Sequence, residues 1–199
     1  MRMDSQKTEL FDNFFSELGL YKIERKLKII VAGGGQLLEK YKLLGNDLEE
    51  KKTNIKFNFL GEVTDINIIK HHNFESNLIV GHGRGILEAM VIGKPVVLLG
   101  FDTKGTQLIT SSNIKNISDY NFSGRNLIVD KKDKTLSEVL NSVNLRDILK
   151  KCGNYNQSYI TEKYDSIIGA KKTIEVYRKT PRYSVKDFFK NLLWLLKKI

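Results

Sequence analysis

The residues best suited to chemistry lie in a glycine-rich turn, Gly81-His82-Gly83-Arg84-Gly85, which Glu88 follows. Glycines let a backbone approach a ligand closely, and free N–H groups at the start of a helix attract anions. The Glu88 carboxylate suits the hydroxyls of a ribose, and it would equally complement the helix dipole. His82 can donate to a phosphate or a sugar hydroxyl, or simply fill space. The turn is therefore a candidate site for a phosphate or sugar ligand.

A second glycine turn, Gly33-Gly34-Gly35, follows the apolar run 27–32. A dinucleotide fingerprint requires a third glycine where Leu38 stands, and an acid at the end of the next strand. The chain has neither, because that strand ends in Leu60-Gly61. Two interpretations stay open for Gly34 and Gly35: contact with a ligand, or a tight turn with no further role.

Other familiar sites are not predicted. His71 and His72 lie in a polar segment without a partner acid or histidine at metal-ligating spacing, so we expect surface residues and no metal site. Cys152 is the only cysteine. It excludes an intramolecular disulfide or a thiolate cluster and favours a reducing compartment. Gly93-Lys94 precedes Pro95, which excludes a phosphate-binding P-loop.

The elements that position the two turns follow from hydrophobic periodicity. The pattern predicts strands at 27–32, 55–61, 78–80, 95–99 and 126–129, and helices at 8–18, 36–51, 65–72, 85–92 and 133–143. Strands that alternate with helices predict an α/β fold, a Rossmann-like doubly wound parallel sheet, with strand 27–32 buried on both faces. Ligands bind such sheets beyond the carboxyl ends of the strands.

After residue 144 the pattern predicts only helices, at 145–151, 155–161 and 164–178. We expect a ligand-binding domain over residues 1–180 and an amphipathic C-terminal helix over residues 181–199.

Charge and composition bound the partners. The 199-residue chain is 41% hydrophobic and carries a net charge of +10 from 33 basic and 23 acidic residues. This balance favours anionic partners, although lysines that cover solvated faces explain it equally well. No aromatic and basic motif supports nucleic-acid binding. The first residues lack the apolar core of a signal peptide, so a cytoplasmic location is expected.

Four segments, in order, resemble the C-terminal, donor-binding domain of retaining family 4 glycosyltransferases, which have the GT-B fold. They are Arg2–Lys7, 29-IIVAGGG-35, 59-FLGEVTD-65 and 83-GRGILEAMVIGKPVV-97. The run Asn121–Asn126 is similar to a subset of bacterial members. The resemblance covers about residues 2–178.

The resemblance implies roles at matching positions. Arg2 and Lys7 correspond to the residues that hold the donor's diphosphate, and Glu88 to the acid that binds the ribose. Glu62 and Val63 correspond to the base pocket. The second glycine turn would face the diphosphate and the donor sugar, through His82, Gly83, Arg84 and Gly85. Gly34 and Gly35 of the first turn are further candidates for contact with the nucleotide-sugar. Val80 stands where many members carry a further Glu, so that role is vacant.

The implied function is to bind a UDP- or GDP-sugar, with no other cofactor and no metal, for transfer to a glycan or lipid-linked acceptor. Because the acceptor-binding domain and the first strand of the donor domain are missing from the resemblance, transfer is expected to need a second polypeptide. Two alternatives remain open. One is a GT-B-type epimerase acting on UDP-N-acetylglucosamine, and the other is a non-catalytic nucleotide-binding module.

The C-terminal stretch 184–199 combines leucines, phenylalanines and Trp194 with lysines. A basic amphipathic helix of this kind can lie on the inner face of a membrane, or it can pack on the acceptor-binding domain. Peripheral membrane contact is the interpretation that we favour for this stretch.

Overall fold

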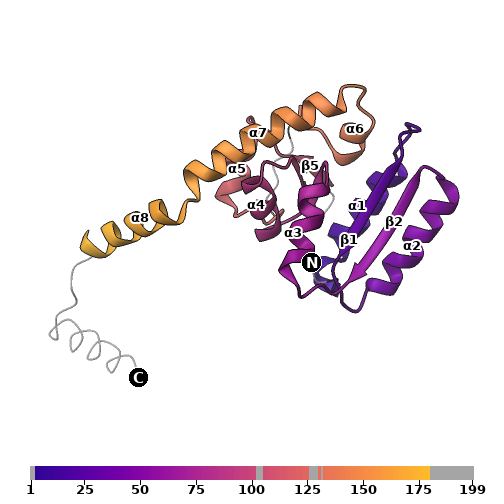
Figure 1. Ribbon diagram of the computed structural model, residues 1–199, viewed down its shortest axis with the longest axis horizontal. Helices are drawn as coiled ribbons and strands as arrows, with labels where there is room; N and C mark the ends of the chain where they lie inside the picture. The colour runs from indigo at the N-terminus through magenta and orange to yellow at the C-terminus, as the bar shows by residue number, and fades with distance from the viewer. Residues whose placement is uncertain (1–2, 102–104, 126–129, 131, 180–199) are drawn as a thin grey trace, which may run out of the picture. The chain divides into compact units, whose positions relative to one another are not determined.

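A computed structural model describes residues 3–101, 105–125, 130 and 132–179 (Figure 1). The chain divides into two compact units, Met1–Thr161 and Glu162–Ile199. The sequence had suggested a boundary at residue 180. Arg2, the predicted strand 126–129 and the C-terminal stretch 184–199 lie outside the described residues.

The helices and strands of the described residues alternate along most of the first unit. In order they are η1 (Ser5–Lys7), α1 (Thr8–Gly19), β1 (Leu27–Ala32), α2 (Leu38–Lys51), β2 (Ile55–Gly61), α3 (Ile66–Glu75), β3 (Ile79–Gly81), α4 (Arg84–Val91), β4 (Val96–Leu99), β5 (Thr106–Leu108), α5 (Ile114–Asp119), α6 (Leu136–Leu140), α7 (Leu145–Lys163) and α8 (Ser166–Lys179). The chain is thus a mixed α/β protein, as the sequence predicted.

The described strands form two small sheets, so the single doubly wound parallel sheet that the sequence predicts is not confirmed. In the first sheet, β1 pairs with β2 in parallel. In the second, β3 pairs with β4 in parallel, and β5 pairs with β4 in the antiparallel direction. The parallel pairs β1–β2 and β3–β4 are each joined through a helix, so two βαβ units are present.

Three details of the sequence interpretation are wrong. No residue of β1 is fully buried, because β1 has a strand neighbour on one edge only among the described residues and Lys28 faces solvent. β5 and α5 were missed. The predicted helices 145–151 and 155–161 are one helix, α7, which runs through Gly153 without a break.

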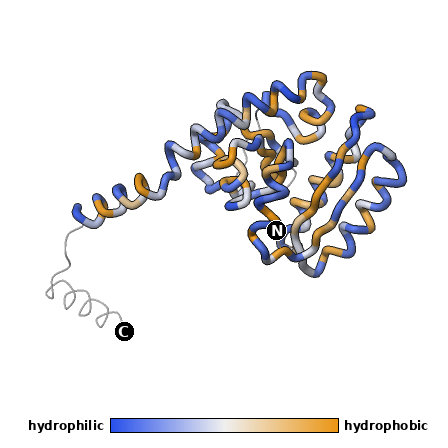
Figure 2. Tube along the Cα trace, in the orientation of Figure 1, coloured by the Kyte–Doolittle hydropathy of each residue, from blue (hydrophilic) through white to orange (hydrophobic). Residues whose placement is uncertain are grey.

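One apolar core joins the two sheets. Leu27 and Ile29 of β1 pack against the same cluster as Val97 of β4 and Leu108 of β5. Leu27 and Ile29, two residues apart, therefore face this core, as the period of a strand requires, and Val31 packs against a second cluster. Figure 2 shows the corresponding hydrophobic residues recurring along β1 and β2.

A second cluster fixes α1 and α2 against the first sheet. Phe15 of α1 stacks on Tyr41 of α2 and on Phe57 of β2, with ring centroids 5.4 Å and 5.6 Å apart. Met3, which is fully buried, belongs to the same cluster. The chain around Met3 is thereby held beside the carboxyl ends of β1 and β2.

In the second unit, the described residues form the end of α7 and helix α8. The residues of α8 are all exposed, and among them are Ile167, Ile174 and Tyr177. Among the described residues, no helix combines the length and the apolar character that a membrane crossing needs.

Candidate functional site

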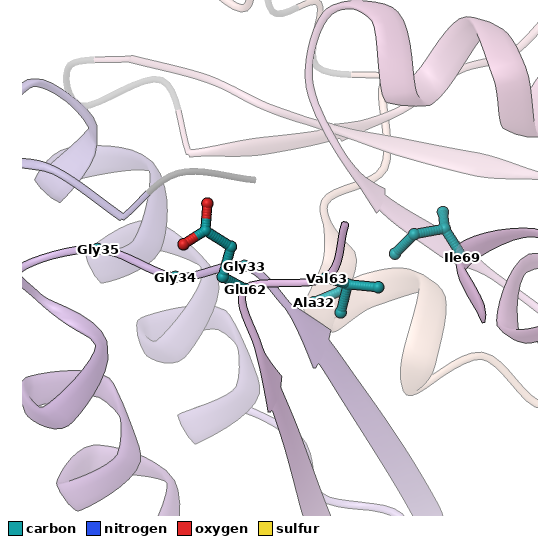
Figure 3. Close-up of a pocket in the computed structure, with 7 residues that line it drawn as sticks. All are labelled: Ala32, Gly33, Gly34, Gly35, Glu62, Val63 and Ile69. Atoms are coloured by element: carbon teal, nitrogen blue, oxygen red, sulfur yellow. The ribbon is translucent and has the colours of Figure 1, made fainter. Parts of the chain in front are cut away.

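A pocket of about 530 Å³ opens at the carboxyl ends of the parallel strands β1 and β2. Its lining comes from the first glycine turn, from the end of β2 and from α3: Ala32, Gly33, Gly34, Gly35, Glu62, Val63 and Ile69. Figure 3 shows the Glu62 carboxylate standing above the glycine turn, with Val63 and Ile69 toward the other end of the pocket. The pocket therefore offers an acid at one end and apolar side chains at the other.

The glycines of this turn are required by close packing. A Cβ atom at Gly34 would lie 2.9 Å from Cβ of Glu62. At Gly35, whose φ is +131°, it would lie 2.4 Å from the carbonyl oxygen of Met3. The structural interpretation of these glycines is thus correct, and contact with a ligand remains compatible with it because both residues line the pocket.

The N–H groups of this turn differ in their partners. The N–H of Gly33 donates to the carbonyl of Gly61 at 2.8 Å. For Gly34 and Gly35, no N–H hydrogen bond is found among the described residues. Consecutive N–H groups of this kind form a concavity that accepts an anion or a carbonyl oxygen.

The segment from Met3 to Lys7 connects this pocket with the second glycine turn. The N–H of Met3 donates to Gly34 O at 2.7 Å, and Met3 O accepts from the N–H of Leu37 at 3.2 Å. Four residues further on, Lys7 lies close enough to His82 to influence its protonation. The Lys7 ammonium also lies 4.0 Å from the Asp4 carboxylate. Lys7 is therefore brought to the edge of the second turn by the buried anchor at Met3.

The second turn leads from the end of β3 into α4. Gly83 caps α4 with a φ of +62°, a left-handed value that favours glycine. Its N–H donates to the carbonyl of Phe122 at 2.7 Å. The N–H of Gly83 is therefore engaged within the chain, and it is not one of the free N–H groups that the sequence suggested at this turn.

The start of α4 still presents open backbone. Arg84 and Gly85 are exposed, and a Cβ atom added at Gly85 would meet no atom within 4 Å. Glu88 is also exposed, but it lies in the second turn of α4, whose first turn contains no acid. Its role as a partner of the helix dipole is thus weaker than the sequence suggested.

The side chain of His82, in the second turn, is half-buried, and its Nε2 atom is buried with no hydrogen-bond partner among the described residues. Its ring centroid lies 6.4 Å from that of Phe101, and the Arg125 guanidinium lies 5.6 Å from the Phe101 centroid. Lys7, His82 and Arg125 thus lie together beside the second turn. We call these three residues the basic group.

The protonation of His82 is disfavoured in the folded chain. Burial lowers the pKa of His82 below its ordinary value of 6.5, and the positive charges of Lys7 and Arg125 lower it further. The imidazole is therefore neutral at neutral pH and has an unpaired ring nitrogen to offer to a ligand.

A pH dependence of stability follows from this shift. Between pH 6.5 and the lowered pKa, the unfolded chain binds a proton at His82 that the folded chain does not bind. His82 therefore costs stability as the pH falls through this window. We expect the urea midpoint of the wild-type chain to fall more steeply than that of His82→Asn below pH 6.5. Equal slopes for the two proteins would show that burial does not disfavour the charged ring.

The structure sorts the residues that the sequence selected into two places. Gly34, Gly35, Glu62 and Val63 line the pocket. The remaining candidates belong to the second turn and to α4 and do not line the pocket: His82, Gly83, Arg84, Gly85 and Glu88. Lys7 lies beside His82, and Arg2 is outside the described residues. Arg125 and Phe101 were not selected, although Arg125 lies in the run Asn121–Asn126 that carried part of the resemblance.

Cys152 does not supply chemistry. It is buried in the core between α7 and the strands, and burial raises the pKa of its thiol. A buried thiol with a raised pKa is a poor nucleophile.

Comparisons of the chain with protein-family models, with curated proteins and with solved structures find no match.

Proposed function

We propose that the chain binds a nucleoside diphosphate carried by a sugar, and that it is the donor-binding half of a glycosyltransferase with the GT-B fold. The observation that carries this proposal is the pocket at the carboxyl ends of two parallel strands, with a basic group at the neighbouring turn. Ligands of doubly wound sheets bind at this edge. We include in this proposal that the two observed sheets are parts of one doubly wound sheet.

The basic group is suited to the diphosphate. Charge-assisted hydrogen bonds from Lys7 and Arg125 would neutralise its oxygens, and the exposed backbone at Arg84 and Gly85 lies at the positive end of the α4 dipole. The same interactions would stabilise the diphosphate as it leaves the sugar, where negative charge develops. The neutral His82 ring can accept from, or donate to, a sugar hydroxyl.

The pocket is suited to the nucleoside. Val63 and Ile69 offer an apolar surface for the base, and the N–H groups of Gly34 and Gly35 offer donors. The two acids near these turns are Glu62 in the pocket and Glu88 in α4. A carboxylate repels phosphate but accepts hydrogen bonds from the two hydroxyls of a ribose. Glu88, which is exposed near the second turn, has this role in the proposal, and Glu62 contacts the base or ribose from the pocket.

Transfer of the sugar requires an acceptor held in line with the donor. We propose that a second polypeptide, or a further domain, supplies the acceptor site. Residues 3–125 supply the donor site and the groups that stabilise the leaving diphosphate.

Titration calorimetry with UDP, GDP and ADP tests the proposal. We expect at least one of them to bind, and Lys7→Ala to weaken that binding about tenfold, because a hydrogen bond to a charged group contributes about 1.5–3 kcal/mol. Gly85→Ala separates an effect on binding from an effect on stability, because a Cβ atom added at Gly85 meets no atom within 4 Å and should not destabilise the fold. We expect it to weaken diphosphate binding while the urea midpoint stays the same or rises.

The matched control is Glu50→Gln, which removes an exposed acid from α2. It should leave the affinity unchanged. Absence of binding by all three diphosphates, or equal binding by wild type, Lys7→Ala and Gly85→Ala, would contradict the proposed site.

A further inference from the structure

We propose that the last turn of α3 binds a zinc ion through His71, His72 and Glu75. The sequence interpretation treated the two histidines as surface residues without a partner acid. His71 and Glu75 are indeed exposed, but α3 extends to Glu75 and brings the three side chains together. One ligand atom of each residue lies within 4.8 Å of those of the other two. The proposal does not depend on the proposed function.

The spacing of the ligand atoms suits a tetrahedral ion. Zinc bonds to imidazole nitrogen and carboxylate oxygen are about 2.0–2.2 Å long, which places two ligand atoms of a tetrahedron about 3.3–3.6 Å apart. His71 Nε2 and Glu75 Oε2 lie 3.3 Å apart. This pair, one helical turn apart, is already at the spacing of a tetrahedral site, and the His72 ligand atom lies within 4.8 Å of both.

His72 provides an independent indication of a ligand. It is half-buried, and its Nδ1 atom is buried with no hydrogen-bond partner among the described residues. A buried nitrogen without a partner costs free energy. Coordination of a cation through Nδ1 of this ring would give that atom the partner that it lacks.

The backbone around the site favours a cation. The three residues lie at the C-terminal end of α3, where the helix dipole is negative. Both the N–H and the hydroxyl of Ser76 donate to His72 O, at 3.0 Å and 2.7 Å, so the turn that carries His72 is fixed. A nearby positive charge is that of Lys94, whose ammonium group is engaged by the carbonyl of Phe74 at 2.6 Å.

Two imidazoles and one carboxylate form a ligand set that zinc uses in proteins, with a fourth position left for water or another ligand. The set contains no thiolate, and imidazole and carboxylate together favour zinc over calcium or magnesium. The ligand set therefore suits zinc, although it is built on a single helical turn.

The test is calorimetric titration of the full chain with zinc chloride alone. We expect one site, and we expect His71→Ala and Glu75→Gln each to weaken zinc binding by a factor of about ten or more, because even loss of an outer-shell partner weakens metal sites about 10–100-fold. His82→Asn is the matched control, since the chain has only three histidines. Glu50→Gln is the control for the carboxylate. Both controls should retain the wild-type affinity.

A second readout identifies the ligands directly. In nitrogen-15 spectra of the imidazole rings, zinc should shift the ring nitrogens of His71 and His72 and leave those of His82 unchanged. The proposal is overturned if zinc does not bind, if His71→Ala and Glu75→Gln bind it as wild type does, or if the ring of His82 responds and those of His71 and His72 do not.

Discussion

Replacement of Phe122 by alanine is expected to lower the free energy of unfolding by about 3–5 kcal/mol, the usual cost of removing a buried phenylalanine ring. Phe122 is fully buried, in the cluster that joins α4, β4 and α5. The same cluster includes Ile86 and Met90 of α4 and Ile160 of α7. Because these residues belong to separate helices, the cavity left by the ring cannot close by a small local movement.

The same substitution is expected to affect the second glycine turn. Phe122 has a left-handed φ of +53°, and its carbonyl accepts the N–H of Gly83. The buried ring therefore holds a backbone conformation that in turn holds the start of α4. In the proposed function, loss of the ring weakens diphosphate binding even under conditions in which the variant is folded.

Urea denaturation followed by circular dichroism measures the stability effect. The matched control is Tyr120→Ala, two residues earlier, where the side chain is 45% exposed. Exposed positions of this kind usually change stability by about 0.5 kcal/mol or less. Similar urea midpoints for Phe122→Ala and Tyr120→Ala would contradict the close packing of α4 against the segment that follows α5.

Gly153→Ala is expected to destabilise the chain, although alanine is the better helix former. In the interior of α7, the substitution gains about 1 kcal/mol of helix propensity. A Cβ atom at this position, however, would lie 2.3 Å from the carbonyl oxygen of Gly93 and 3.3 Å from Pro95. Backbone atoms cannot rotate away as a side chain can, so α7 has to move, and overpacking costs about 1–3 kcal/mol or more. Because the clash is with a backbone atom, we expect the upper part of that cost, about 2–3 kcal/mol, and therefore a net loss of about 1–2 kcal/mol.

The control for this prediction is Gly169→Ala in α8. Gly169 also lies inside a helix, but a Cβ atom there would meet nothing within 4 Å. Only the propensity contributes, so Gly169→Ala should not lower the urea midpoint of either unit. An increase in stability for Gly153→Ala would mean that α7 does not pack closely on the turn between α4 and β4.

The two strands whose bounds the sequence predicted correctly, β1 and β2, have a similar composition and a glycine at or directly after their ends. β1 and β2 are rich in β-branched or aromatic residues. Gly33 follows β1 and Gly61 ends β2, and the structure reproduces their predicted bounds of 27–32 and 55–61. Hydrophobic periodicity over six or seven residues is therefore a sufficient signal here. The sequence likewise placed α1 and α4 to within one residue at each end.

The elements that were missed depend on tertiary contacts. β5 is only three residues long and includes Thr106 and Gln107, which give no apolar signal. Both are nevertheless buried, and the Thr106 hydroxyl accepts the N–H of Leu136. Contacts between residues this far apart in the sequence determine the strand, so no local pattern could predict it. The continuity of α7 is similar, because Gly153 is explained by the close approach of Gly93 and not by a helix end.

The candidate site was predictable in part. The glycines at the strand ends drew attention to Gly34, Gly35 and the second turn, and Gly34 and Gly35 line the pocket. The basic group was not predictable as a group, since Lys7, His82 and Arg125 are far apart in the sequence. Arg125 makes a cation–π contact with Phe101, which only the folded chain reveals.

Diffraction from crystals of the chain grown with saturating UDP or GDP tests the central claim most directly. We predict density for the diphosphate beside Lys7 and the start of α4, with the ribose at Glu88 and the base between the glycine turn and Val63. An empty pocket with both nucleotides, or a nucleotide bound only away from the two glycine turns, would contradict the account.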